Sequence, residues 1–275
     1  MQQIYRLLKN TSIMAENSKH SAEQPSTEAT ADFYKTLSRD DFDSEVIKRE
    51  DDINQKSTGF HIFKAIRKIY SNKELGTVID VGGNYGIFLK MLSEEFVVKR
   101  KVCLDIAEPP VRIKDIEYLI GFAEETLKRL NENSVDLVLL QDVIEHIFDP
   151  DRLILNLKYV LKDGGVIILS TPNLSSFINR ILLLFGFEPM GVEVSTKTVF
   201  GRPGSSVAGH IRNFTYRALR DFFEYYGFNV EVQYTYASYL SKGSSKLSKL
   251  IHWIDKGSVI FGKKYRSQIF LIAKK

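Results

Sequence analysis

Residues 77–88 read TVIDVGGNYGIF, and this stretch decides the fold. An apolar run ends at Asp80, and Gly82, Gly83 and Gly86 follow before apolar residues resume at helical spacing. Glycines between a strand and a helix allow positive φ, and they let a ligand approach the backbone and the free N–H groups of the helix start. The order D-x-G-G-N-x-G lacks the G-x-G-x-x-G spacing of a dinucleotide loop. We therefore expect a ligand-binding turn that is not built for a pyrophosphate.

Beyond residue 74, short apolar runs alternate with segments of helical periodicity. The runs occupy residues 77–81, 101–106, 116–121, 135–140 and 165–170. Continuous runs of this kind are typical of strands covered on both faces, which implies a parallel sheet with crossover helices. Two later runs, residues 229–240 and 267–275, have no full crossover helix between them and predict an antiparallel hairpin at the sheet edge. Gly164 and Gly165 are expected to end the helix that begins near residue 151.

Composition indicates the domain boundaries. The chain has 275 residues, of which 44% are hydrophobic, so it can bury a full core. Residues 10–31 are rich in Ser, Thr, Glu, Asn and Ala, which predicts a flexible polar tail over residues 1–31. Phe60, Phe63 and Ile66 recur at helical spacing and predict an N-terminal helical cap over residues 32–73. The main domain is expected over 74–275, with inserts at 172–213 and 239–262.

The charge and the cysteine content of the chain limit the kinds of partner and of cellular environment that we expect. The single cysteine, Cys103, lies in an apolar run, so a disulfide framework is excluded and a reducing cytoplasm is expected. A formal net charge of +4 is too small to indicate nucleic acid binding, and no apolar run reaches a membrane-spanning length. Residues 246–256 place leucines and isoleucines along one stripe flanked by lysines. Such a stripe either packs on the domain or makes a peripheral membrane or partner contact.

Two motifs carry a resemblance to a known family. The turn D-x-G-G-N-x-G resembles the first motif of class I S-adenosylmethionine-dependent methyltransferases, approximately D/E-x-G-x-G-x-G, with Asn84 at the middle glycine. Asn tolerates a left-handed backbone better than other non-glycine residues. The segment QDVIEHIFDP, residues 141–150, resembles the x-E/D-V-x-E-H-x-x-D-P segment of the subgroup that includes ubiquinone-biosynthesis O-methyltransferases and related small-molecule methylases. The likeness covers roughly residues 74–172, and more weakly 209–228.

The resemblance implies a Rossmann-like, doubly wound, mostly parallel seven-stranded sheet with an antiparallel C-terminal hairpin strand. It also implies transfer of a methyl group from S-adenosylmethionine to a small-molecule acceptor, most simply at oxygen. The implied cofactor-binding residues are Asp80, Gly82, Gly83, Asn84, Gly86, Asp105, Phe122, Ala123 and Asp142. Asp105 ends the second strand, where a carboxylate can accept hydrogen bonds from both ribose hydroxyls. Phe122 stands where the family often has aspartate, so it either packs on the adenine ring beside the Ala123 backbone or is ordinary core.

Three roles are open for the segment that follows the fourth strand. His146 can act as a general base, because the ordinary pKa of histidine, about 6.5, suits proton transfer near neutrality. Alternatively, Glu145 and His146 fix the turn structurally. Thirdly, Asp142, Glu145 and His146 at i, i+3 and i+4 would share one face of a helical turn, and the resemblance to quinone methylases implies Mg²⁺ at these positions.

The insert at 172–213 is the expected acceptor site, because it is too long for a simple connection. Its polar residues are Asn173, Asn179, Arg180, Glu193, Arg202, His210 and Arg212. Among these, His210 and Arg212 are the predicted substrate contacts. Two other functions stay open: an NAD-linked oxidoreductase, which the missing G-x-G-x-x-G disfavours, and a methyltransferase fold that binds a nucleoside or partner without turnover.

Overall fold

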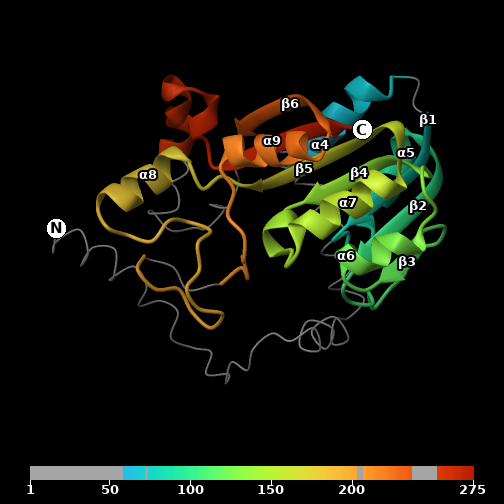
Figure 1. Ribbon diagram of the computed structural model, residues 1–275, viewed down its shortest axis with the longest axis horizontal. Coiled ribbons are helices and arrows are strands. Elements are labelled where there is room, and N and C mark those ends of the chain that lie inside the picture. Colours follow the sequence, from blue (N-terminus) through green and yellow to red (C-terminus); the bar gives the residue numbers. More distant parts are fainter. Residues whose placement is uncertain (1–57, 72–73, 203–206, 237–252) are drawn as a thin grey trace.

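A seven-stranded sheet forms the centre of the molecule, with the strand order β3-β2-β1-β4-β5-β7-β6 (Figure 1). The computed structural model describes residues 58–71, 74–202, 207–236 and 253–275. The strands are β1 (Glu74–Val81), β2 (Val97–Asp105), β3 (Glu117–Ile120), β4 (Val135–Gln141), β5 (Leu161–Pro172), β6 (Asn229–Tyr236) and β7 (Gln268–Lys274). Strands β1 to β5 pair in parallel, and β7 is antiparallel to both neighbours. The predicted fold class is confirmed.

Helices cover both faces of this sheet. The α-helices are α4 (Thr58–Ile69), α5 (Ile87–Glu95), α6 (Ala123–Thr126), α7 (Pro150–Val160), α8 (Phe177–Leu184) and α9 (Tyr216–Tyr225), and the 3-10 turns are η2 (Leu127–Arg129), η3 (Ile144–His146), η4 (Ser258–Phe261) and η5 (Lys263–Tyr265). Apolar residues of α7 and α9 pack on one face, and those of α4 and α5 pack on the other. Burial on both faces explains why the central strand β4 reads as an almost continuous apolar run.

The order of the last two strands differs from their order in the sequence. β7 lies between β5 and β6, so β6 forms the sheet edge (Figure 1). The antiparallel pairing of β6 with β7 agrees with the predicted hairpin. Tertiary packing decides which strand of the hairpin pairs with β5. All of β7 except its last residue is buried, which suits the inner position.

The expected glycine cap after α7 is wrong. The helix ends at Val160, and Leu161 is its extended C-cap. Leu161 is fully buried and pairs with Val135 at the start of β5. Gly164, with φ of 78°, lies inside β5, where the register between β4 and β5 shifts. The positive φ of Gly164 therefore accommodates the irregularity in β5 and not the end of a helix. A helical sequence pattern does not reveal this use of glycine.

Parts of the predicted domain organisation fall outside the described residues. The tail at 1–31 lies outside them, and of the cap at 32–73 the structure describes α4 and the residues that follow it to 71. The insert at 172–213 contains α8, and most of the apolar stripe at 246–256 also lies outside the described residues. Within the described part of the chain, no helix combines the length and apolar character needed to span a bilayer.

Candidate active site

The glycine turn after β1 adopts the left-handed backbone that its sequence predicts. Gly82, Asn84 and Gly86 have φ values of 70°, 53° and 78°. A Cβ on Gly82 would lie 2.6 Å from Cγ2 of Val143, so this position has no room for a side chain. Gly86 is the N-cap of α5. The expectation that asparagine can replace the middle glycine without losing the turn is met by the backbone of Asn84.

Asp105 ties this turn to the end of β2. Its Oδ2 accepts a hydrogen bond from the Asn84 N–H at 2.9 Å, and its Oδ1 accepts one from the Ala107 N–H at 3.3 Å. Burial raises the pKa of Asp105, and these backbone donors oppose that shift. The side-chain Oδ1 of Asn84 is buried and accepts no hydrogen bond from any of the described residues. Within the described part of the chain, the turn therefore presents a buried acceptor without a partner.

A cavity of about 430 Å³ opens at the carboxyl ends of β1, β2 and β4. Of the predicted cofactor residues, its lining includes Gly82, Asn84, Asp105, Phe122, Ala123 and Asp142, and His146 also lines it. Asp80 and Gly83 line a smaller adjoining hollow together with Gln141. Phe122 is 51% exposed, so the reading of Phe122 as ordinary core is wrong. The sequence reasoning missed Gln141, Val143 and Phe148, all of which line this region.

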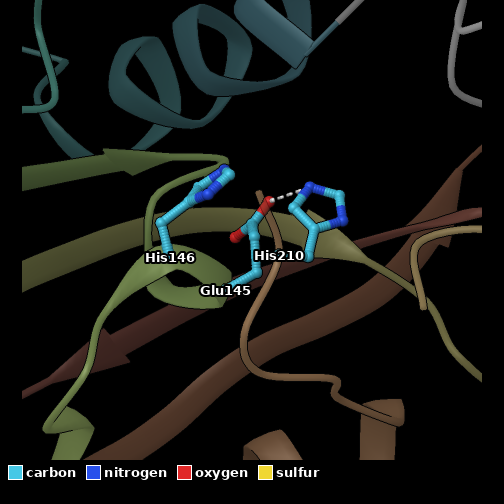
Figure 2. Close-up of side chains that lie close together, drawn as sticks. All are labelled: Glu145, His146 and His210. Carbon is cyan, nitrogen blue, oxygen red and sulfur yellow. Dashed lines mark ion pairs between the residues drawn. The ribbon is translucent and has the colours of Figure 1, made fainter. Parts of the chain in front are cut away.

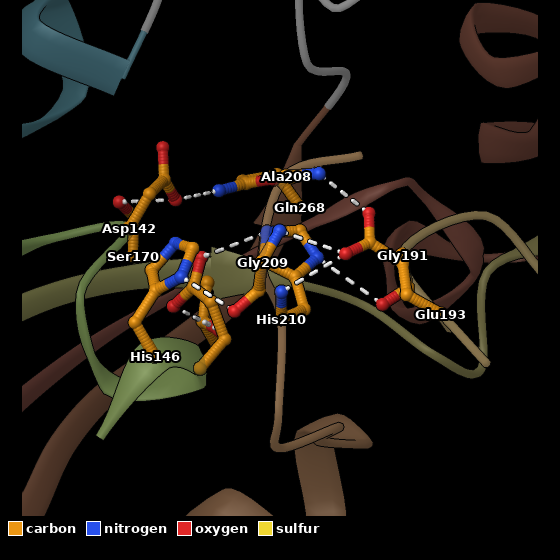
Figure 3. Close-up of polar contacts among 11 residues, drawn as sticks. Asp142, His146, Ser170, Gly191, Glu193, Ala208, Gly209, His210 and Gln268 are labelled. Atoms are coloured by element: carbon orange, nitrogen blue, oxygen red, sulfur yellow. Dashed lines mark hydrogen bonds and ion pairs between the residues drawn. The ribbon is translucent and has the colours of Figure 1, made fainter. Parts of the chain in front are cut away.

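The turn after β4 differs from the predicted helical turn. Asp142 has φ of 53° and precedes the 3-10 turn η3, so Asp142, Glu145 and His146 do not share one α-helical face. The Asp142 Oδ1 accepts hydrogen bonds from Ser170 Oγ at 3.0 Å and from Gln268 Nε2. Ser170 and Gln268 come from β5 and β7, so the sheet and not the local sequence orients this carboxylate (Figure 3).

Glu145 is a buried carboxyl group, only 1% exposed. Its Oε2 accepts a hydrogen bond from Thr171 Oγ1 at 2.9 Å. Its Oε1 has no hydrogen-bond partner among the described residues and lies 4.0 Å from His210 Nε2 (Figure 2). Burial first, and then the charge of Asp142, raise the pKa of Glu145 to about 8. Burial therefore favours the protonated form of this carboxyl group.

His146 and His210 stand beside this carboxyl group with their ring centroids 4.9 Å apart (Figure 2). The Nδ1 of His146 lies 3.1 Å from the carbonyl oxygen of Gly209, and the Nδ1 of His210 lies 3.1 Å from that of Gly191. A carbonyl oxygen only accepts, so each Nδ1 carries a proton and a neutral ring keeps its lone pair on Nε2. Partial burial, followed by the nearby His210, lowers the pKa of His146, and the Gly209 carbonyl opposes this shift.

The two predicted substrate contacts, His210 and Arg212, lie in different surroundings from each other. His210 joins Glu145 and His146, as described above. Arg212 instead donates from Nη2 to the carbonyl oxygen of Phe148 at 2.5 Å, and its backbone N–H donates to that of Glu145 at 2.9 Å. Arg212 thus fastens the insert to the turn after β4, and its guanidinium already has a protein partner.

The residues that the structure brings together differ from the predicted metal ligands. Among the described residues, donor atoms of Glu145, His146 and His210 all lie within 4.8 Å of one another, and Asp142 is not a member of this cluster. Mg²⁺ prefers carboxylate, carbonyl and water oxygens. Two imidazole nitrogens and a single carboxylate are a poor match to that preference, so this cluster does not support the predicted Mg²⁺ site.

Comparisons with known proteins agree with this geometry. A family model described as a methyltransferase domain matches residues 59–233. Flavonoid 7-O-methyltransferase 1B of Mentha piperita is 31% identical over 80 residues, which are 28% of this chain and 22% of that enzyme. A ubiquinone biosynthesis O-methyltransferase of Coxiella burnetii is 23% identical over 176 residues, covering 58% of this chain and 72% of that enzyme. The chain thus spans about a fifth of the first relative and most of the second.

Solved structures give the same fold. A SAM-dependent methyltransferase from Archaeoglobus fulgidus superimposes with a TM-score of 0.50 at 21% identity, over 78% of this chain and 94% of that one. At this identity the likeness concerns the fold alone. The family model, by contrast, covers more than half of the chain and includes the glycine turn, Asp105 and the turn after β4. The chain belongs to the family of S-adenosylmethionine-dependent methyltransferases.

Proposed function

We propose that this protein transfers the methyl group of S-adenosylmethionine to a hydroxyl oxygen of a small-molecule acceptor, with His146 as the general base. The observation that carries the proposal is the position of His146. Its ring lines the cavity, and its Nδ1 is held on the Gly209 carbonyl, which leaves Nε2 as the atom able to take a proton. The names of the flavonoid and ubiquinone relatives support transfer to oxygen.

The residues of the cavity fit S-adenosylmethionine. The volume of about 430 Å³ lies in the range of cofactor sites. The glycine turn brings bare backbone to the cavity wall, and the buried Oδ1 of Asn84 offers an acceptor that a ligand donor can satisfy. Asp105 uses only part of its accepting capacity on Asn84 and Ala107, so it can still receive ribose hydroxyls. Phe122 and the Ala123 backbone would hold the adenine, and Asp80, Gly83 and Asp142 would complete the cofactor site.

The chemistry requires a proton to leave the acceptor. When bound, S-adenosylmethionine supplies an electrophilic methyl group on a positively charged sulfur. His146 Nε2 takes the hydroxyl proton as the oxygen gains the methyl group, so the imidazole ends protonated. Its lowered pKa keeps it neutral, and therefore able to accept, at neutral pH. The raised pKa of Glu145 favours its protonated form, which does not compete for this proton.

The acceptor would enter on the side of the insert at 172–213. His210 reaches the base from this insert, and its side chain is 13% exposed, so it can contact a substrate only at the inner end of the site. Arg212 would line the rim beside Phe148. A fold that binds S-adenosylmethionine without turnover remains the competing function. Methyl transfer from labelled cofactor to a panel of phenols and other hydroxyl compounds separates the two, because only the binding protein would take up cofactor and release no methylated product.

Chelation is expected to leave activity unchanged within about twofold, because proton transfer by His146 needs no Lewis acid. The measurement compares initial rates before and after treatment with excess EDTA and dialysis. Loss of activity that Zn²⁺ or Mg²⁺ restores would contradict this and would assign the cluster of Glu145, His146 and His210 to a metal.

Replacing Asn84 by glycine is expected to weaken S-adenosylmethionine binding by about fivefold to tenfold, the usual contribution of one hydrogen bond. Glycine adopts the same left-handed backbone without strain, so the substitution removes the side-chain amide, with its buried Oδ1, and keeps the turn. Asn133, with φ of 50°, lies outside the residues that line the cavity, and Asn133→Gly is the matched control. Calorimetric titration measures both affinities. An unchanged affinity for Asn84→Gly would mean that the asparagine serves backbone geometry alone.

A further inference from the structure

Glu193, a residue of the insert, holds three consecutive backbone N–H groups. Its Oε1 accepts from the Ala208 N–H at 2.6 Å, and its Oε2 accepts from the N–H groups of Gly209 at 2.7 Å and His210 at 3.2 Å (Figure 3). Gly209 has φ of 81°, which lets successive N–H groups converge on one anion. Hydrogen bonds to a carboxylate are shorter and stronger than neutral ones. Glu193 therefore fixes the path of residues 208–210.

The same backbone segment sets the protonated nitrogen of His146. The Gly209 carbonyl, which accepts from His146 Nδ1, belongs to a residue whose N–H is bound to Glu193. The Gly191 carbonyl, which accepts from His210 Nδ1, lies two residues before Glu193. The carboxylate thus joins the two stretches of the insert that supply both acceptors (Figure 3).

The far end of this segment has a separate attachment. The N–H groups of Ile211 and Arg212 both donate to the carbonyl oxygen of Glu145 at 2.9 Å. That attachment uses backbone atoms only, so no substitution removes it directly. Glu193 is the side chain that binds the N–H groups of residues 208–210, and changing it should release the Gly209 carbonyl while Ile211 and Arg212 stay bound.

We propose that Glu193 is a positioning residue for methyl transfer, which keeps the proton of neutral His146 on Nδ1 and the lone pair on Nε2 by holding the Gly209 carbonyl in place. The inference rests on the proposed role of His146 as base. Which ring nitrogen of a histidine carries the proton is set by the hydrogen bond of the other. Once the Gly209 carbonyl moves away, Nε2 can hold the proton, and a ring in that form cannot accept the hydroxyl proton there.

The test compares Glu193→Ala with Glu188→Ala by ¹⁵N NMR of the imidazole nitrogens and by steady-state kinetics. Glu188 is the matched control. Burial lowers the pKa of Arg202 and the charges of both Glu193 and Glu188 oppose that shift, whereas the three N–H groups are bound by Glu193. The chain has five histidines, so the spectrum of His146→Ala assigns the signals of His146. Both variants are first checked for cooperative thermal unfolding.

In Glu193→Ala we expect the His146 signals to change from the Nδ1–H form to a mixture with the Nε2–H form. We also expect kcat to fall about tenfold or more, as for a displaced catalytic group, while the Kd of S-adenosylmethionine stays within about twofold. Glu188→Ala should match the wild type in all three. Unchanged His146 signals in folded Glu193→Ala would overturn the proposal. A changed tautomer with unchanged kcat would leave the positioning intact and refute His146 as the base, so the two failures are distinguishable.

A second variant applies if Glu193→Ala does not fold. Glu193→Gln keeps one accepting oxygen but turns an NH₂ group toward at least one backbone N–H. We expect a smaller change of the same kind in the His146 signals and in kcat. Wild-type values for both quantities in Glu193→Gln would also overturn the proposal.

Discussion

Replacing His146 by alanine is expected to lower kcat by about 10²- to 10⁴-fold, the usual contribution of a positioned general base. The S-adenosylmethionine affinity should change by less than about twofold, because the polar cofactor contacts that we propose come from the glycine turn and Asp105 and not from the imidazole. Single-turnover methyl transfer measures the first quantity, and calorimetric titration of the cofactor measures the second. Turnover equal to that of the wild type would refute the base and favour a purely structural role for the turn.

The pH dependence of the wild type gives an independent check. A base must be neutral to act, so kcat/KM should fall as pH drops through the lowered pKa of His146. The charged or titratable groups that face this ring are His210, Glu145 and Glu193. Partial burial and His210 lower its pKa, and Glu193 raises it. An acid limb well above the ordinary histidine pKa of about 6.5 would point to a different titrating group.

Replacing Asp105 by alanine is expected to weaken S-adenosylmethionine binding by about 1–3 kcal/mol, or roughly fivefold to 150-fold. The substitution removes the carboxylate proposed for the ribose hydroxyls and also frees the N–H of Asn84, which it now holds at 2.9 Å. Asp163→Ala is the matched control, since that side chain is 98% exposed at the start of β5. Affinity is measured by calorimetry for both variants.

Asp105→Asn separates the two parts of this effect. Asparagine keeps one accepting oxygen, which can hold the Asn84 N–H, but it loses the negative charge. We expect an affinity between those of the wild type and Asp105→Ala. An Asp105→Ala variant that is folded and binds the cofactor as tightly as the wild type would place the ribose elsewhere in the cavity.

The sequence was sufficient wherever the determining interactions are local. The apolar runs predicted the strands, because a strand covered on both faces needs apolar side chains at nearly every position. The turn after β1 could be predicted from Gly82, Asn84 and Gly86, because left-handed backbone favours these residue types. Asp105 was located from its place at the end of a strand. In each case, a few residues that are neighbours in the sequence are enough to determine the local structure.

The predictions failed where a distant element overrides the local pattern. Gly164 belongs to β5 because Leu161 is drawn into the sheet opposite Val135. Asp142 does not belong to the predicted helical turn, because its carboxylate accepts hydrogen bonds from Ser170, 28 positions away, and from Gln268, 126 positions away. No helical periodicity could indicate these partners, because both lie on strands that reach Asp142 only in the folded sheet.

The sequence by itself determined the family and the left-handed turn after β1, and it gave the prediction that His146 is the base, since each depends on residue types at fixed short spacing. Only the tertiary structure brought His210 to Glu145 and His146. Only it placed the carboxylate of Glu193 against the N–H groups of residues 208–210. These groups come from an insert without periodic pattern, and the Gly209 carbonyl lies 63 positions from the ring that it holds. Contacts of this kind depend on the path of the folded chain, to which Glu193 contributes by binding the N–H groups of residues 208–210.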